Sequence, residues 1–192
     1  MMYNQPLHVQ IALLQKIIGQ NEVIQNILKL APTLEMPNWY LGAGCISQTV
    51  WNFLSGFSLS QHIKDFDLVY FDSSDLSYEA EDFYIQKAKD LEIPVEIRNQ
   101  ARVHLWYEKH FGYQIKPYVS VEDAINRWPT TATCVGVKSV NGGLLVYAPY
   151  GLNDLAGMTV RPNKIQITKE IYEKKVSRWK KIWQKLTIIP WE

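Results

Sequence analysis

Two aspartates in one short apolar segment are the residues best suited to do chemistry. Asp65 and Asp67 stand two positions apart in DFDLVYFD, residues 65–72, which otherwise has the pattern of a buried strand. Side chains at positions i and i+2 of a strand lie on the same face, so both carboxylates point the same way. Like charges resist ionisation together, and a buried charge without a partner is costly. A divalent cation would compensate them.

Glu96, in the segment PVEIRNQ, is the candidate third acid from a later strand. Magnesium prefers oxygen ligands and is commonly held by one or two carboxylates together with substrate phosphates. Three carboxylates would complete a two-metal site for Mg²⁺ or Mn²⁺, which can activate an attacking hydroxyl and stabilise the leaving oxygen of a phosphoryl displacement. The competing interpretation of Glu96 is a strand residue that faces solvent.

The segment Gly42-Ala43-Gly44 lies between a predicted strand and a predicted helix. A glycine-rich backbone can approach a ligand closely, and the free N–H groups of a helix N-terminus favour an anion. We therefore expect Gly42, Gly44 and the hydroxyl of Ser47 to bind phosphates. Arg98, which follows the third acid, is a further phosphate-binding candidate, with an ordinary ion pair as the alternative.

The elements that position these groups follow from hydrophobic spacing and turn residues. Helical spacing predicts helices within residues 5–33, with a break at 19–21, and over 45–56, 73–92, 99–112, 120–128 and 168–186. Strands are predicted within 38–44, 66–72 and 93–100, and a hairpin with an Asn-Gly-Gly turn within 131–151. The expected fold class is α+β, a mixed β-sheet with flanking helices. We expect a single domain over residues 1–192, with N-terminal helices in 1–35, a core in 36–162 and a C-terminal helix in 163–192.

Composition and charge exclude several classes of protein. The chain has 20 basic and 19 acidic residues and a net charge of +1, which argues against a surface that coats nucleic acid. The sequence shows no apolar run of the ~20 residues that a membrane helix needs. The start of the chain, MMYNQPLHVQ, lacks the features of a signal peptide, and Cys45 and Cys134 suit reduced thiols. These features favour a cytoplasmic protein without a membrane partner.

The order of glycine-rich turn, helix and Asp-x-Asp strand resembles the nucleotidyltransferase fold superfamily. YLGAGCISQ, residues 40–48, is similar to the YLVGGAVRD segment of tRNA CCA-adding enzymes and bacterial poly(A) polymerases. Gly44 takes the place of the second glycine, whereas Ala43 replaces the first and Ser47-Gln48 replaces Arg-Asp. The resemblance implies a metal-binding role for the Asp-x-Asp pair and makes Glu96 the candidate third acid.

A more specific resemblance, from Trp39 to Pro162, is to a family of small bacterial nucleotidyltransferase-like proteins. It is carried by the segments DFDLVYFD, LSYEAE, RNQARVH, TATCVGV, APYGLNDL and RPN. The resemblance implies the nucleotidyltransferase fold and leaves the substrate open.

These observations lead to three hypotheses. The first is a metal-dependent nucleotidyltransferase that moves a nucleoside monophosphate from a nucleoside triphosphate to an unknown acceptor hydroxyl. The alternative is a catalytically inactive nucleotide-binding or protein-interaction module on the same fold, suggested by the altered Gly-Gly and Arg-Asp positions. The third is nucleic-acid binding by the last helix, whose basic residues also suit a solvated face: Lys174, Lys175, Arg178, Lys180, Lys181 and Lys185.

Overall fold

A five-stranded mixed sheet lies at the centre of the molecule, seen here in a computed structural model that describes residues 2–192. The strand order is β3-β2-β1-β4-β5; β2 and β3 are parallel, and the other neighbouring pairs are antiparallel. The strands are β1 (Tyr40–Gly42), β2 (Asp67–Tyr70), β3 (Glu96–Asn99), β4 (Gly136–Val140) and β5 (Gly143–Tyr147). The arrangement confirms the predicted α+β class with a mixed sheet.

Most helices begin and end within a few residues of the predicted positions, although α4 begins at Tyr78, five residues after its predicted start, and the short α7 lies outside the predicted helices. Side chains of Asn21, Ser77, Ser120 and Thr168 cap α2, α4, α6 and α8, which satisfies N–H groups that a helix N-terminus leaves unpaired. Gly56 ends α3 in the left-handed conformation. The helices are α1 (Leu7–Ile18), α2 (Glu22–Leu30), α3 (Gly44–Ser55), α4 (Tyr78–Asp90), α5 (Val103–Phe111), α6 (Val121–Asn126), α7 (Asn153–Ala156) and α8 (Lys169–Ile182).

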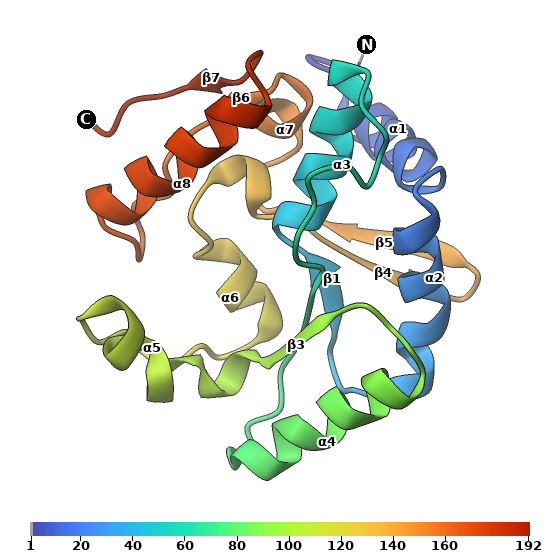
Figure 1. Cartoon of the computed structure of the whole chain (residues 1–192), viewed down its shortest axis with the longest axis vertical. Coiled ribbons are helices and arrows are strands. Elements are labelled where there is room, and N and C mark those ends of the chain that lie inside the picture. The colour runs from blue at the N-terminus through green and yellow to red at the C-terminus, as the bar shows by residue number, and fades with distance from the viewer. Residues whose placement is uncertain (1) are drawn as a thin grey trace.

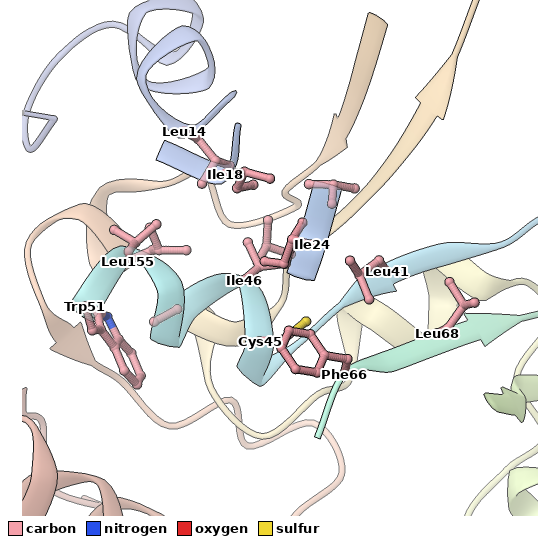
Figure 2. Packing of buried hydrophobic residues seen from close by; sticks show 14 of the residues in the cluster. Leu14, Ile18, Ile24, Leu41, Cys45, Ile46, Trp51, Phe66, Leu68 and Leu155 are labelled. Atoms are coloured by element: carbon pink, nitrogen blue, oxygen red, sulfur yellow. The ribbon is translucent and has the colours of Figure 1, made fainter. Parts of the chain in front are cut away.

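The two faces of the sheet have different surroundings. Leu41, Leu68 and Val137 are paired across β1, β2 and β4, and they join the main core with side chains of α1, α2 and α3. Figure 2 shows Leu41 and Leu68 on their strands near Cys45 and Ile46 of α3. In Figure 1, α1 and α2 lie on one side of β1, whereas α5, α6 and α8 lie on the other. On the face opposite the main core, called the second face below, Tyr40 and Val69 pack against Val121 and Ile125 of α6.

Two further short strands hold the end of the chain, and the sequence did not predict them. β6 (Thr159–Val160) and β7 (Thr187–Ile188) form a parallel pair. The hydroxyl of Tyr172, on α8, hydrogen-bonds to the carbonyl oxygens of Val160 (2.8 Å) and Ile189 (2.6 Å). α8 is thereby fastened to the rest of the fold. None of the helices in residues 2–192 has the length and apolar character to cross a membrane.

Candidate functional site

Asp67 lies in a row of four residues that crosses the second face of the sheet. Gly42 and Glu96 are its partners on β1 and β3, and Gly136 is the partner of Gly42 on β4. Paired residues on adjacent strands face the same side, so the carboxylates of Asp67 and Glu96 share this face. A Cβ atom at Gly42 would lie only 2.7 Å from a ring carbon of Trp128. The glycine therefore lets the segment around Trp128 pack directly on the sheet beside Asp67.

A first cavity, about 160 Å³ in volume, joins the two aspartates to the glycine-rich turn. Asp65 and Asp67 line it together with Ala43 and Gly44. Asp65 is exposed just before β2, and Asp67 is the first residue of the strand and is partly buried. The structure thus brings the predicted carboxylate pair to the same cavity as the turn.

The N-terminus of α3 opens into this cavity. α3 begins at Gly44, and within the described chain no side chain caps it, in contrast to α2, α4, α6 and α8. Ala43 precedes the helix with φ 57° and ψ −130°, a conformation that normally requires glycine and costs on the order of 1–3 kcal/mol. The N–H of Ala43 donates to the carbonyl oxygen of Val135 at 3.0 Å, which holds the turn in place. Backbone N–H groups are therefore available to an anion in the cavity.

The charge of Asp67 is poorly compensated by the protein. Burial and then repulsion by Glu96 raise the pKa of Asp67 to about 6, and Asp65 adds to the effect. Lys175 and Arg98 act in the opposite direction. A carboxylate that is mostly ionised at neutral pH but disfavoured by its surroundings is a suitable ligand for a cation.

α8 brings two cations to the cavity. Lys175 and Arg178 line it, and Lys175 is partly buried. Burial, followed by the charge of Arg178, lowers the pKa of Lys175, while the two aspartates oppose this shift. Lys175 is one of the residues of the predicted basic helix face, although it stands four residues after Ile171 and four before Trp179. This spacing on the apolar side of a helix could have identified it as a site residue.

Tryptophans fix α8 against α3. The rings of Trp179 and Trp183 meet the ring of Trp51 edge-on, with centroids 5.3 and 5.5 Å away. The indole Nε1 of Trp183 donates to Oδ1 of Asn52 at 2.8 Å. This tryptophan cluster therefore packs α3, whose N-terminus faces the cavity, against α8, which carries the two cations.

The residues predicted to bind phosphate at the turn occupy different surroundings. Gly44 lines the first cavity, whereas Gly42 lies under Trp128. Ser47 is buried, and its hydroxyl donates to the carbonyl oxygen of Ala132 at 2.7 Å, so it holds α3 against residues 131–133. Gln48, which sequence reasoning did not select, lines the cavity.

Glu96, at the β3 end of the row, pairs with Arg98. Nη2 of Arg98 lies 3.4 Å from Oε2 of Glu96, and the two side chains are 46% and 50% exposed. Exposed pairs of this kind contribute at most about 1 kcal/mol, so a ligand can readily replace the contact. Among residues 2–192, no three His, Cys, Asp or Glu side chains are grouped to hold a metal ion. Asp65 and Asp67 nevertheless form a donor set that suits magnesium shared with substrate phosphates.

The two cysteines lack the properties of a nucleophile. Cys45 and Cys134 are unpaired and buried. Burial is the main cause that raises the pKa of Cys134 to about 12 and the pKa of Cys45 still further above its ordinary value. A thiol that stays protonated is a weak nucleophile.

A second cavity, about 350 Å³ in volume, adjoins the first. Both cavities are lined by Ala43, Asp67, Pro129 and Lys175. Residues 62, 64 and 65, before Asp67, line the first cavity, whereas Val69, after it, lines the second. The two cavities therefore meet at Asp67 from opposite directions along β2. The remaining walls of the second cavity include five aromatic side chains, those of Trp106, Tyr107, Phe111, Tyr118 and Trp128.

Comparison with known proteins identifies the family. A family model described as "Nucleotidyltransferase" matches residues 29–188, a range that contains the turn, both aspartates and α8. A solved structure described as an NMR structure that "reveals a CCA-adding enzyme head domain" is 26% identical, with a TM-score of 0.76. The match covers 93% of this chain and 95% of that chain. No curated protein matched the sequence. Because the family model matches most of its length, the chain belongs to this nucleotidyltransferase family.

Proposed function

We propose that the protein is a magnesium-dependent nucleotidyltransferase that moves a nucleoside monophosphate from a nucleoside triphosphate to an acceptor hydroxyl. The observation that carries the proposal is the first cavity, where Asp65, Asp67 and the uncapped N-terminus of α3 meet. Carboxylates for a metal and N–H groups for phosphates are the two requirements for holding a metal–triphosphate complex. Nucleoside triphosphates and magnesium abound in the cytoplasm, so the proposal also favours that location.

In this proposal the triphosphate lies in the first cavity with its β- and γ-phosphates toward α3. The first turn of α3, which begins at Gly44, offers backbone N–H groups, and Lys64 and Arg178 offer positive charge from two other walls. Lys175 lines both cavities, so its ammonium group is suited to neutralise charge that develops on the α-phosphate and the departing pyrophosphate.

Asp65 and Asp67 would hold Mg²⁺ or Mn²⁺ in this cavity. When bound, the metal supplies positive charge to the transferred phosphoryl group. Glu96 is paired with Asp67 across β2 and β3 but lines neither cavity in this structure; it is the candidate that accepts the proton of the attacking hydroxyl once its side chain turns toward Asp67. For that role its carboxylate must leave the guanidinium of Arg98, which the weak contact permits.

Isothermal titration tests the proposal. Wild-type protein is titrated with the α,β-methylene analogues of ATP, CTP, GTP and UTP, each with and without MgCl₂, and Asp67→Ala is treated in the same way. We expect magnesium-dependent binding to the wild type and at least about tenfold weaker binding to Asp67→Ala, since the main metal ligand is lost. Asp90→Ala, at the exposed end of α4, is the matched control. Equal affinities of the wild type and Asp67→Ala would refute the metal assignment.

The alternative is a nucleotide-binding or protein-interaction module without catalysis, and two observations favour it. Ala43 keeps a strained conformation where the resemblance places a glycine, and Glu96 is paired with Arg98 instead of completing a three-carboxylate set. Incubation of the protein with α-³²P-labelled triphosphates, Mg²⁺ and cell extract separates the two functions. Metal-dependent transfer of label that requires Asp67 would rule out the inactive module.

A further inference from the structure

The second cavity lies where an attacking group would have to enter. In phosphoryl transfer the attacking and leaving oxygens stand roughly in line on opposite sides of the phosphorus. If pyrophosphate leaves toward α3, as in the proposed function on which this inference rests, then the attacking hydroxyl must approach Asp67 from the other direction. Val69, after Asp67 on β2, lines the second cavity, while Asp65, before it, lines the first. The second cavity is on the required side.

We propose that this second cavity is the acceptor site, and that the acceptor is a small hydroxyl compound with a planar ring and an anionic group. The volume of about 350 Å³ is within the usual range of small-molecule sites, roughly 300–1,000 Å³. The cavity opens onto Asp67 and Lys175, so an acceptor in it can present a hydroxyl to a phosphate held there.

The aromatic side chains that line the second cavity are the reason why we expect the acceptor to contain a planar ring. Trp106 and Phe111 of α5 line the cavity, and both keep part of their surface accessible; Phe111 is 36% exposed. Ile171 of α8 adds an apolar side chain to the lining. A planar ring laid on these side chains would displace water from apolar surface and gain stacking contacts.

The charged residues that line the second cavity are the reason why we expect the acceptor to carry an anionic group. Asp67, at the junction of the cavities, is the only carboxylate among the described residues that line the second cavity. Arg98 lines it, and its weak pair with Glu96 can be exchanged for a ligand anion. Arg127 donates hydrogen bonds to both carboxylate oxygens of Asp123, so the charge of Arg127 is already compensated within the protein. The second cavity offers one carboxylate and several cationic side chains, so charge repulsion disfavours a polycationic acceptor.

The wall is held in shape by hydrogen bonds between side chains from distant segments. The hydroxyl of Tyr113 donates to the carbonyl oxygen of Gln166 and also bonds to the hydroxyl of Tyr107. The hydroxyl of Tyr118 donates to Oε1 of Gln166 at 3.0 Å. Residues 107–118 are thus tied to residue 166, and a preformed wall reduces the entropy that a ligand must lose on binding.

The test asks whether a nucleoside monophosphate binds beside a bound triphosphate. AMP and UMP carry a planar ring, an anion and ribose hydroxyls, and are titrated by calorimetry into protein saturated with Mg²⁺ and the α,β-methylene triphosphate analogue that binds best. We expect AMP or UMP to bind, with affinity at least about tenfold weaker in Trp106→Ala because ring stacking is lost. Arg98→Ala, which alters an exposed side chain, should weaken the same binding if Trp106→Ala does not fold. Phe83→Ala, an exposed aromatic on α4, is the control.

The outcomes separate this inference from the proposed function. If no triphosphate analogue binds, the proposed function fails, and AMP and UMP titrated into the protein alone still decide whether the second cavity takes them in a Trp106-dependent way. Three results would overturn the acceptor site: displacement of the triphosphate analogue by the monophosphates, loss of triphosphate rather than monophosphate affinity in Trp106→Ala, or absence of monophosphate binding. Trp106-dependent binding of the polycation kanamycin in their place would overturn the acceptor class.

Discussion

Asp67 occupies a position where its charge opposes folding. Burial and then Glu96, which is paired with Asp67 across β2 and β3, raise the pKa of Asp67, and Lys175 and Arg98 supply partial positive compensation. Active sites commonly keep groups that the fold alone would disfavour, because the substrate or metal supplies the missing partner. Stability and function should therefore respond in opposite directions to neutralisation of this residue.

We predict that Asp67→Asn stabilises the metal-free protein at pH 7.5 by about 1–2 kcal/mol. The pKa of Asp67 in the folded state is raised from 3.8 to about 6 by burial, Glu96 and Asp65, against the opposing charges of Lys175 and Arg98. The folded state thus holds the proton more tightly than the unfolded state, so the wild type loses stability as pH rises between these values. The advantage of the asparagine should disappear near pH 4.

Urea unfolding of both proteins at pH 7.5 and pH 4, in EDTA, checks this prediction. Asp90→Asn, which alters an exposed aspartate at the end of α4, should leave the free energy of unfolding unchanged at both values. A wild type that is more stable than Asp67→Asn at pH 7.5 would show that the carboxylate is fully compensated within the protein.

Ala43 gives a second prediction at the scale of one residue. Its φ of 57° and ψ of −130° suit glycine, which takes such angles without steric cost. Ala43→Gly relieves strain but adds freedom to the unfolded chain, and we expect a net gain of about 1 kcal/mol in the free energy of unfolding. Chemical denaturation measures the change, with Ala80→Gly in α4 as a control that should destabilise by a similar amount. If Ala43→Gly destabilises the protein, the backbone at Ala43 is not strained as proposed.

Among the elements, α8 has the largest influence on the site. Lys175 and Arg178 from α8 line the first cavity, while Trp183, just beyond its end, is 1% exposed and packs against Trp51 of α3. The apolar side of the helix thus fixes the distance between its cations and the N-terminus of α3. Packing around Trp183 should therefore control both stability and affinity for a triphosphate.

We predict that Trp183→Ala lowers the free energy of unfolding by about 3–4 kcal/mol, as expected for deletion of a buried aromatic side chain. The deletion also leaves Oδ1 of Asn52 without the indole donor. Trp183→Phe keeps most of the packing and should recover about half of the loss. Urea unfolding measures all three proteins, and Lys181→Ala, on the exposed side of α8, should differ from the wild type by less than about 0.5 kcal/mol. A small effect of Trp183→Ala would mean that α8 is only loosely attached.

The sequence predicted those elements whose signals are local. Asn21 and Ser120 cap helices at the predicted break and the predicted helix start, whereas α4, capped by Ser77, begins five residues after the predicted position 73. Asn141 and Gly142 take the positive φ angles that a tight hairpin turn requires. β6 and β7 have two residues each, too few for a period to be visible.

The sequence allowed prediction of those site residues that lie close together in one segment of the chain. Asp65 and Asp67 share a segment, and they do line one cavity. The role of Lys175 depends on which neighbour α8 packs against, and the aromatic wall combines side chains from 103–128 with residues after 165. The hydroxyl of Ser47 meets a carbonyl oxygen 85 positions away. Such long-range contacts leave no periodic trace in a single sequence.

For the molecule as a whole, both ends of the chain pack into one core. Leu14 and Ile18 of α1 belong to the same buried cluster as Trp179 and Leu186 near the C-terminus. The side-chain amide of Gln15 also donates to the carbonyl oxygen of Leu144 on β5, which ties α1 to the edge of the sheet. A shared core makes separate unfolding of the terminal helices unfavourable, and it supports the expectation of a single domain.

We therefore predict one cooperative unfolding transition, with coincident urea curves from far-UV circular dichroism and tryptophan fluorescence. The dichroism reports helices at both ends, and the fluorescence reports all seven tryptophans, which include the cluster of Trp51, Trp179 and Trp183 between α3 and α8. Mg²⁺ with the best triphosphate analogue at about 100 times its dissociation constant should move both curves together, by about 2.7 kcal/mol. At the same ligand concentration Asp67→Ala, with its affinity at least about tenfold weaker, should move by no more than about 1.4 kcal/mol. Two separated transitions, or a ligand effect on one probe alone, would mean that the terminal helices fold independently of the core that holds the site.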